Sequence, residues 1–205
     1  RKLAIKYNKQ ILIRDIKLEN SSNFEKTARD IRYKFFEEII LENSYENLIT
    51  AHQLNDKLEW FMMQLSKGAG LVELLGFNEF EEKENYKIYK PLLNTTKDEL
   101  ENYLRNNNYK YFVDKSNFDE KYKRNYFRHN FLEDFLEEFK AGTKKSFEYL
   151  QNDLNSLNIQ NKPLKKIEEL EIFPNQNDDN LNIRIIDLSL KKRGILLTSA
   201  QRNEI

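Results

Sequence analysis

The residues of this chain that are best suited to chemistry lie between Ala51 and Trp60, where a short apolar run passes into a helical pattern. Asp56 and Glu59 are three residues apart, so their carboxylates share one face of a helix that begins near Leu54. Two neighbouring carboxylates can hold a magnesium ion or an ammonium group, because oxygen ligands suit both. The helix dipole also favours acidic residues at any solvent-facing helix start, so a purely structural role stays open.

Two further polar positions lie on either side of this predicted helix. His52 follows the apolar run, at a strand end where α/β folds place their ligands, although a structural histidine would fit there too. Lys67, Gly68 and Gly70 form a small turn that could bring backbone amides and one cation to a phosphate. A glycine that ends a helix beside a lysine is the commoner explanation of such a turn.

A second polar cluster, from Asp114 to Arg128, mixes acidic, basic and aromatic residues. On a helix, Arg124 and Arg128 lie one turn apart with Lys121 on the same side. Such a face could bind the phosphates of a nucleotide or of an RNA backbone. The alternative is a surface helix whose arginines pair with acidic neighbours, namely Asp114, Asp119 or Glu133.

The composition removes several classes of protein. The 205 residues contain no cysteine, which excludes disulfides, cysteine zinc clusters, iron–sulfur sites and thiolate nucleophiles, and fits a cytoplasmic location. Lysine plus arginine equals aspartate plus glutamate at 34 each, so only local clusters can argue for RNA binding. No apolar run approaches the roughly 18 residues of a membrane helix, so we expect no membrane partner. A Gly-x-Ser-x-Gly elbow is also absent, which leaves a triad hydrolase little support.

The elements that must position these residues alternate between strand and helix in the first half of the chain. Strand, helix, strand, helix within about seventy residues predicts βαβ units around a parallel sheet, the Rossmann-like α/β class. The expected strands are residues 10–17, a buried parallel strand at 47–51, and 86–93 up to Pro91. The expected helices are residues 1–7, one from about 22 with Ser22 and Glu25 as a capping box, 55–66, and 97–106. Thr95 or Thr96 could cap this last helix, and Glu99 would complete a capping box with Thr96.

The second half of the chain is predicted to be mainly helical. The acidic residues 79–84 are expected to form a solvated loop and residues 174–179 a linker. The helices are expected at 119–139, at 143–157 after a break at Gly142, at 163–170, at 182–193, and at a capped start near 198–202. We place an α/β domain at residues 1–140 and a helical linker at 141–205.

Five stretches of the sequence, in order and spacing, resemble the motifs of the tRNA(Ile)-lysidine synthetase family, in the N-type ATP pyrophosphatase superfamily. Glu25 through Tyr33 resembles Glu-x-x-Ala-Arg-x-x-Arg-Tyr, and Ala51 through Glu59 resembles Ala-His-His-x-x-Asp-x-x-Glu. The other three resemble Arg-Gly-x-Gly, Arg-Pro-Leu-Leu, and Asp-x-Ser-Asn-x-Asp followed by Arg-Asn-x-x-Arg. They are Lys67 to Gly70, Lys90 to Leu93, and Asp114 to Arg128.

The resemblance implies an enzyme that uses ATP and Mg²⁺ to adenylate the wobble cytidine of an isoleucine tRNA, after which an amine of free L-lysine displaces AMP. It implies catalytic roles for Asp56 and Arg124 and a lysine-binding role for Asp56 with Glu59. The nucleotide-binding residues would be Arg29, His52, Lys67, Gly68, Gly70 and Asn125. The tRNA-binding residues would be Lys121 and Arg128. Residues 1–140 would be the catalytic domain, and residues 141–205 would contain the linker and the start of a tRNA-contacting region. The expected partners are the tRNA(Ile) with a wobble cytidine and free L-lysine, and a homodimer is left open.

The chain departs from the family pattern at three points. Gln53 replaces the second histidine, and Lys67 replaces an arginine, which loses the two-pronged hydrogen bonding of a guanidinium. The Ser-Gly-Gly-x-Asp-Ser pyrophosphate loop is absent from the sequence and would precede Arg1. We therefore expect this stretch, alone, to lack the main ATP-binding loop and the first strand and to be inactive.

Two other functions compete with this hypothesis. Another tRNA-modifying ATP pyrophosphatase, such as a thiolation enzyme, commonly needs cysteines, which this chain lacks. A non-catalytic RNA-binding helical module would use the face from Lys121 to Arg128, and its binding would weaken steeply with salt without any need for ATP.

Overall fold

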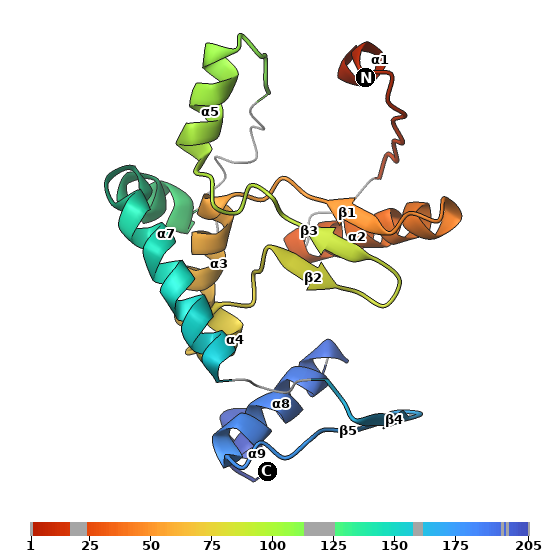
Figure 1. Ribbon diagram of the computed structural model, residues 1–205, viewed down its shortest axis with the longest axis vertical. Coiled ribbons are helices and arrows are strands. Elements are labelled where there is room, and N and C mark those ends of the chain that lie inside the picture. The colour runs from red at the N-terminus through yellow and green to blue at the C-terminus, as the bar shows by residue number, and fades with distance from the viewer. Residues whose placement is uncertain are drawn as a thin grey trace. The chain divides into compact units, whose positions relative to one another are not determined.

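The computed structural model describes residues 2–16, 24–112, 126–157, 162–193, 195 and 197–204 (Figure 1). The chain forms two compact units, each built from two separate stretches of sequence. The first unit contains Arg1–Gln53 and Asn78–Leu93, and the second contains Leu54–Phe77 and Asn94–Ile205. The chain therefore leaves the first unit just before the helix with the candidate carboxylates, and returns to it before entering the second unit again.

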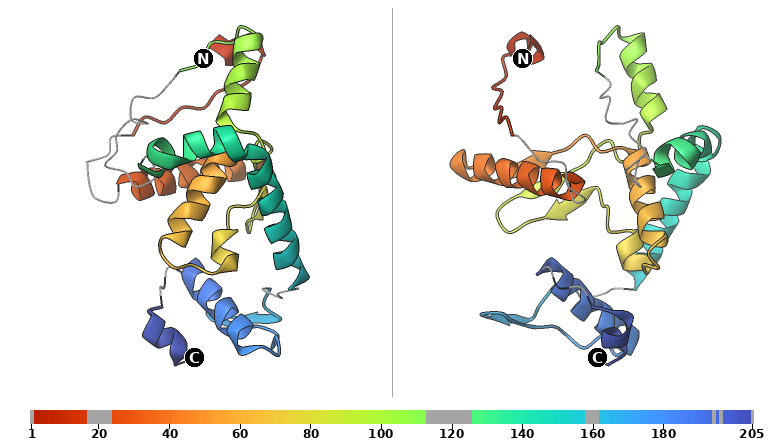
Figure 2. Two further views of the ribbon diagram at one scale, coloured as in Figure 1. Left: turned by 90° about the vertical axis from the view of Figure 1, so that its left-hand side faces the viewer. Right: turned by 180° about the vertical axis from the view of Figure 1, so that it is seen from behind.

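The first unit is a three-stranded sheet with one long helix against it. Its helices are α1 (Lys2–Lys6) and α2 (Phe24–Glu42), and its strands are β1 (Asn47–Ile49), β2 (Phe80–Glu82) and β3 (Lys87–Tyr89). The strand order is β1-β3-β2, with β1 parallel and β2 antiparallel to β3. The helix α2 lies behind the sheet in Figure 1 and in front of it in the reverse view of Figure 2.

A small apolar core joins the helix α2 to the sheet. Ile40 of α2 is buried with Tyr86 and Ile88, and the half-buried side chains of Tyr33 and Leu48 pack against them. Tyr33 and Ile40 are seven residues apart on α2, so they lie on one face of the helix, and this face packs against the sheet. Ser22 lies outside the described residues, so its expected capping role stays a prediction.

Three predictions about the strands of this unit are wrong. Residues 10–16 form no strand; the Nη1 atom of Arg14 lies 2.6 Å from Glu38 Oε2 and its guanidinium lies over the Phe35 ring, so α2 holds this segment by its side chain. The expected loop at residues 79–84 contains the strand β2. The strand β1 is parallel, as predicted, but it is not buried, because Ile49 is 70% exposed.

A buried lysine explains why an acidic segment can form the strand β2. Lys90 is 1% exposed, and its Nζ donates to the carbonyl oxygen of Asn78 at 2.9 Å and to the carboxylate of Glu81. Burial alone would raise the pKa of Glu81, but the hydrogen bond and charge of Lys90 outweigh it and hold that pKa below its usual value. The carboxylate of Glu81 thus compensates a buried cation, which no local sequence pattern specifies.

The second unit is mainly helical. Its helices are α3 (Leu54–Leu65), α4 (Leu71–Leu74), α5 (Lys97–Asn106), the π-helix η2 (Arg128–Leu132), α7 (Glu133–Ser156), α8 (Asp179–Lys192) and α9 (Ser199–Asn203). An antiparallel hairpin, β4 (Lys165–Ile167) with β5 (Leu170–Ile172), completes it. Among the helices that the structure describes, none has the length and apolar composition needed to cross a membrane.

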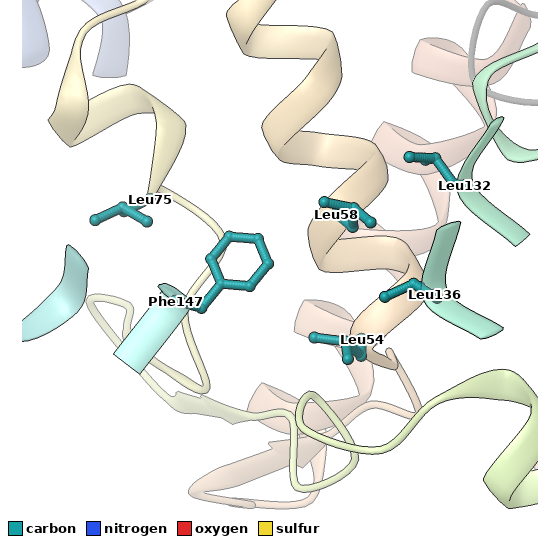
Figure 3. Close-up of a cluster of buried hydrophobic side chains, with 6 residues drawn as sticks. All are labelled: Leu54, Leu58, Leu75, Leu132, Leu136 and Phe147. Carbon is teal, nitrogen blue, oxygen red and sulfur yellow. The ribbon is translucent and has the colours of Figure 1, made fainter. Parts of the chain in front are cut away.

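The core of the second unit fixes α3 against η2 and α7. Leu54 and Leu58 lie one turn apart on α3 and are buried against Leu132, Leu136 and Phe147 (Figure 3). Leu75 completes this cluster of buried side chains. Because α3 carries both candidate carboxylates, the core holds their helix in a defined place.

Two predictions about the helices of this unit are wrong. The helix α7 passes through Gly142 without the expected break. It is kinked at Phe139, where the earlier of the two expected helices was predicted to end, and the Thr143 hydroxyl donates to the Phe139 carbonyl oxygen at 3.0 Å. Such a back-bonded hydroxyl is a known cause of helix bending. Residues 163–170, expected to be helical, form most of the β4–β5 hairpin, whose turn contains Glu168 at a φ of 52°.

Other helix predictions are confirmed. The helix α5 begins and ends at the predicted residues, and Thr96 and Glu99 form the expected capping box at its start. Thr198 and Gln201 form another box at the start of α9. The division into a catalytic domain at 1–140 and a linker at 141–205 assigns function rather than shape, and it stays a prediction.

Candidate functional site

A guanidinium group lies against both candidate carboxylates. The Nε atom of Arg128 donates to Glu59 Oε1 at 2.6 Å, and its Nη2 lies 3.6 Å from Asp56 Oδ1. The side chain of Glu59 is 1% exposed, that of Asp56 12% and that of Arg128 15%. Asp56 stands in the first turn of α3 and Glu59 one turn later, so the predicted shared helical face is confirmed.

The burial of Glu59 requires a cation beside it. An ionised carboxylate inside a protein is costly unless it is paired and hydrogen-bonded, and Arg128 supplies both kinds of compensation. Asp56 is the more exposed of the two acids, with 12% of its side chain exposed against 1% for Glu59. Arg128 was expected to bind tRNA or to pair with acidic neighbours such as Glu133; its tRNA-binding role stays a prediction.

The backbone that carries Arg128 is unusual. The π-helix η2 begins at this residue, and the N–H of Glu133 donates to the Arg128 carbonyl oxygen, one residue further along the chain than in an α-helix. Single π-helical turns are rare and often occur at functional sites. The extra residue in this turn rotates the position of Arg128 about the helix axis, relative to the residues of α7 that follow.

A charged cluster continues from this site along α7. The Nζ atom of Lys97 donates to Glu133 Oε1 at 2.7 Å, and the His129 Nδ1 lies 3.6 Å from the other oxygen, Oε2. Burial alone would raise the pKa of Glu133, but the hydrogen bond and charge of Lys97 outweigh it and hold that pKa below its usual value. Further along, Glu99 accepts hydrogen bonds from Lys144.

Two of the predicted nucleotide-binding residues belong to the first unit. The Nδ1 atom of His52 lies 2.8 Å from the Thr50 hydroxyl, which sets the orientation of its half-buried ring. The guanidinium of Arg29 lies 5.5 Å from the ring centre of Tyr33. It lines an open hollow of about 410 Å³ between α2 and the β2–β3 strands, together with Asp30, Tyr33, Glu37, Glu81, Lys83, Glu84 and Tyr86. Four of these eight residues are acidic, and the nucleotide role of Arg29 stays a prediction.

The turn from Lys67 to Gly70 ends the helix α3. Gly68 has a φ of 72°, the left-handed conformation that suits glycine, and its N–H donates to the Leu65 carbonyl oxygen. Gly70 precedes α4, and a Cβ atom added there would lie 1.9 Å from Arg184 Nη1, so the absence of a side chain admits this arginine. The helix-ending role is thus observed, and the proposed contact with a nucleotide stays a prediction.

The structure unites only part of the predicted site. Asp56, Glu59 and Arg128 converge in the second unit, where Lys67, Gly68 and Gly70 also lie. His52 and Arg29 belong to the first unit. Lys121, Arg124 and Asn125 lie outside the described residues, as do Asp114 and Asp119.

Sequence reasoning missed one residue beside the site. Asn55 is buried next to Asp56, and its Oδ1 accepts the backbone N–H of Lys97 at 2.9 Å. The Thr96 capping box in the sequence located the start of α5, but it did not reveal that Lys97 at this start is hydrogen-bonded to Asn55. A polar residue on the inner side of α3, flanked by Leu54 and near Leu58, was the only available indication.

The comparison with known protein families is clear. The sequence pattern of the PP-loop domain family (ATP_bind_3) matches residues 1–135, about two thirds of the chain. The chain therefore belongs to the PP-loop domain family, which accords with its mixed α/β architecture.

Individual relatives are similar over a longer stretch. The tRNA(Ile)-lysidine synthase of Campylobacter jejuni (strain RM1221) is 47% identical over 206 aligned residues, which cover 100% of this chain. That of Helicobacter pylori (strain J99) is 40% identical over 183 residues and 89% of this chain, and that of Helicobacter hepaticus is 36% identical over 238 residues and 100% of it. This chain spans 61%, 52% and 56% of the lengths of these three proteins.

Proposed function

We propose that the protein to which this chain belongs joins free L-lysine to the wobble cytidine of tRNA(Ile), using ATP, and so forms lysidine. The observation that carries the proposal is the Asp56–Glu59–Arg128 site, which joins two of the motifs that resemble this family. Membership of the PP-loop family and the names of its relatives support it. We place the reaction in the cytoplasm and keep a homodimer as a proposal that light scattering can test.

The proposed reaction has two steps. In the first, the carbonyl oxygen of the cytidine attacks the α-phosphorus of ATP, an O–P bond forms, and pyrophosphate leaves. In the second, the lysine nitrogen attacks the ring carbon that carries this oxygen, a C–N bond forms, and the C–O bond breaks. The oxygen departs with AMP, and the amine gives up its protons to the surroundings. A carbonyl oxygen is a poor leaving group until it carries such a phosphoryl group.

Asp56 is the residue that we propose binds and orients the lysine. Its carboxylate is partly exposed, whereas Glu59 is buried against Arg128, so Asp56 offers the accessible negative charge. An ammonium group beside this carboxylate would share it with Arg128 Nη2, at 3.6 Å. Glu59 would hold the Arg128 guanidinium. The guanidinium would therefore not move closer to Asp56.

The other roles are proposed from the resemblance. Arg124 and Asn125 would bind the phosphates or the adenylated base, and Lys121 and Arg128 would contact the tRNA. Arg29, His52 and the Lys67–Gly70 turn would line the nucleotide side. A cation near the α-phosphate would favour the first step, because negative charge builds up there in the transition state.

Mg²⁺ is the cofactor that we propose accompanies ATP. Such ions are usually held by substrate phosphates and one or two carboxylates. Among the residues that the structure describes, no group of three or more metal-ligating side chains converges. Asp56 and Glu59 face Arg128 and do not fit a metal site, so we assign no step to the ion.

The decisive experiment uses the complete protein. Purified protein is incubated with ATP, Mg²⁺, L-lysine and tRNA(Ile) carrying a wobble cytidine, and the digested tRNA is examined for lysidine by mass spectrometry. Pyrophosphate release should require the tRNA, and lysidine should require both the tRNA and lysine. A tRNA with uridine at the wobble position is the matched control and should remain unmodified.

Two outcomes would contradict the proposal. ATP turnover that leaves the wobble cytidine unchanged would point to another ATP-dependent modification. Binding of RNA that weakens steeply with salt, with no need for ATP, would favour a non-catalytic RNA-binding module.

A further inference from the structure

Asn55 connects the helix that carries the acids to a distant turn of the chain. We infer that Asn55 is a positioning residue for lysine binding: it fixes the first turn of α3, and with it Asp56, against the start of α5. The inference rests on the proposed function, because that function assigns the lysine to Asp56. Asn55 is 5% exposed, so its polar atoms have little access to water.

The hydrogen bonds of Asn55 and Leu54 tie two helix starts together. The Asn55 Oδ1 accepts the backbone N–H of Lys97 at 2.9 Å, although the two residues are 42 apart in sequence. One residue earlier, the N–H of Leu54 donates to the Thr95 carbonyl oxygen at 2.9 Å. The first N–H groups of a helix have no partner inside it, so Asn55 caps α5 while it anchors α3.

Lys97 extends this connection to the helix that follows the arginine. Its backbone is bound by Asn55 on one side, and its side chain donates to Glu133 Oε1 at 2.7 Å on the other. Glu133 is the first residue of α7, and its N–H donates to the carbonyl oxygen of Arg128. The start of α5 is therefore bonded both to α3, which carries Asp56, and to the start of α7, which follows Arg128.

The geometry predicts what happens when the acceptor is lost. Asn55→Ala removes the acceptor of the partly buried Lys97 N–H and frees the first turn of α3 to shift. Asp56 stands in that turn, next to Asn55, so its carboxylate would move relative to Arg128. Displacements of about 1 Å in a reacting group can cost about 100-fold in rate.

The test measures steady-state kinetics of lysidine formation by the complete protein. For Asn55→Ala, we expect kcat/KM for lysine to fall about 10- to 100-fold, while the KM for ATP stays at the wild-type value. Asn55→Asp keeps an acceptor oxygen at the same position and should recover most of the loss. Asn102→Ala is the matched control, because Asn102 is exposed on α5 and its side chain bonds to Asp98 and Arg105 of the same helix.

A second variant keeps the test informative if Asn55→Ala does not fold. Lys97→Met preserves the backbone N–H for Asn55 but removes the bond to Glu133, and it should also lower kcat/KM for lysine. An active wild-type protein whose Asn55→Ala and Lys97→Met variants have normal kinetics overturns the inference alone. Equal losses for ATP and lysine, not rescued by Asn55→Asp, would also overturn it, because they indicate general damage. A wild-type protein that forms no lysidine overturns the proposed function itself.

Discussion

The Nε atom of Arg128 lies 2.6 Å from Oε1 of Glu59, although 69 residues separate them in the chain. This bond joins the helix α3 to the π-helix η2 through a carboxylate that is almost completely buried. Asp56, one turn earlier and partly exposed, stands at the outer edge of the same pair. Asp56 and Glu59 look alike in the sequence, but in the structure Glu59 is buried against Arg128 and Asp56 is partly exposed.

The buried pair predicts a large loss of stability when only one partner is changed. Glu59→Gln keeps the shape of the side chain but leaves Arg128 without its closest negative charge, so we expect a loss of about 3 kcal/mol in the free energy of unfolding. Urea denaturation followed by circular dichroism measures this loss.

The matched control changes both partners of that pair. A double Glu59→Met and Arg128→Met variant replaces the ions with apolar side chains of similar length, and it should lie within about 1 kcal/mol of the wild type. If the double variant loses as much free energy of unfolding as Glu59→Met and Arg128→Met lose separately when added together, the two side chains do not interact.

The accessible acid predicts a loss of activity without a loss of fold. Asp56→Asn preserves the size of the side chain and removes its charge, so we expect kcat/KM for lysine to drop by about 100-fold. The circular dichroism spectrum should stay that of the wild type. Asp98→Asn, a change at an exposed acid in the first turn of α5, is the control and should keep full activity. An Asp56→Asn protein with normal lysidine formation would show that the lysine is bound elsewhere.

Two glycines predict stability changes of opposite sign. Gly68 has a φ of 72°, which residues with a Cβ adopt only with strain, so Gly68→Ala should cost about 1 kcal/mol. Gly142 lies inside α7, and a Cβ added there meets no atom within 4 Å. Gly142→Ala should therefore stabilise the protein by about 0.5 to 1 kcal/mol, because alanine is the better helix former. Thermal unfolding of both variants measures the signs, and equal signs would contradict this account.

Glu99 predicts part of the acid sensitivity of the fold. The backbone N–H of Thr96 and the Lys144 side chain lower the pKa of Glu99 from its usual value, against an opposing effect of burial. The unfolded chain therefore takes up a proton more readily than the folded one. The stabilisation is complete above about pH 4.5 and is lost as the pH falls through the lower pKa of the folded state.

The variant that tests this is Glu99→Gln, which retains a side-chain oxygen for the capping box but cannot titrate. Plotted between about pH 3 and pH 7, its free energy of unfolding should decline less steeply on the acid side than that of the wild type. Parallel curves for the two proteins would show that Glu99 does not contribute to the acid limb.

Much of the helical structure is predictable because its causes are local. Thr96 and Glu99 are three residues apart, and together they specify the start of α5. The apolar spacing of Leu54 and Leu58 likewise gives α3 and places Asp56 and Glu59 on one face. Helix caps and helical periodicity depend on near neighbours, so a single sequence contains them.

The strands and the site needed the tertiary structure because their causes are distant. The acidic strand β2 forms around the buried Lys90, and the β4–β5 hairpin receives a hydrogen bond from Ser189 of α8 to Glu171. The kink at Phe139, and the different roles of Glu59 and Asp56, also depend on contacts.

The sequence by itself therefore determined most of the helices, the candidate acids and the family they resemble. Only the tertiary structure decided which acid is buried, which cation it binds and which residue holds its helix in place. The physical reason is that a buried charge needs a partner that the folded chain brings to it. Arg128 and Glu59 are 69 positions apart in the chain and meet only in the folded structure.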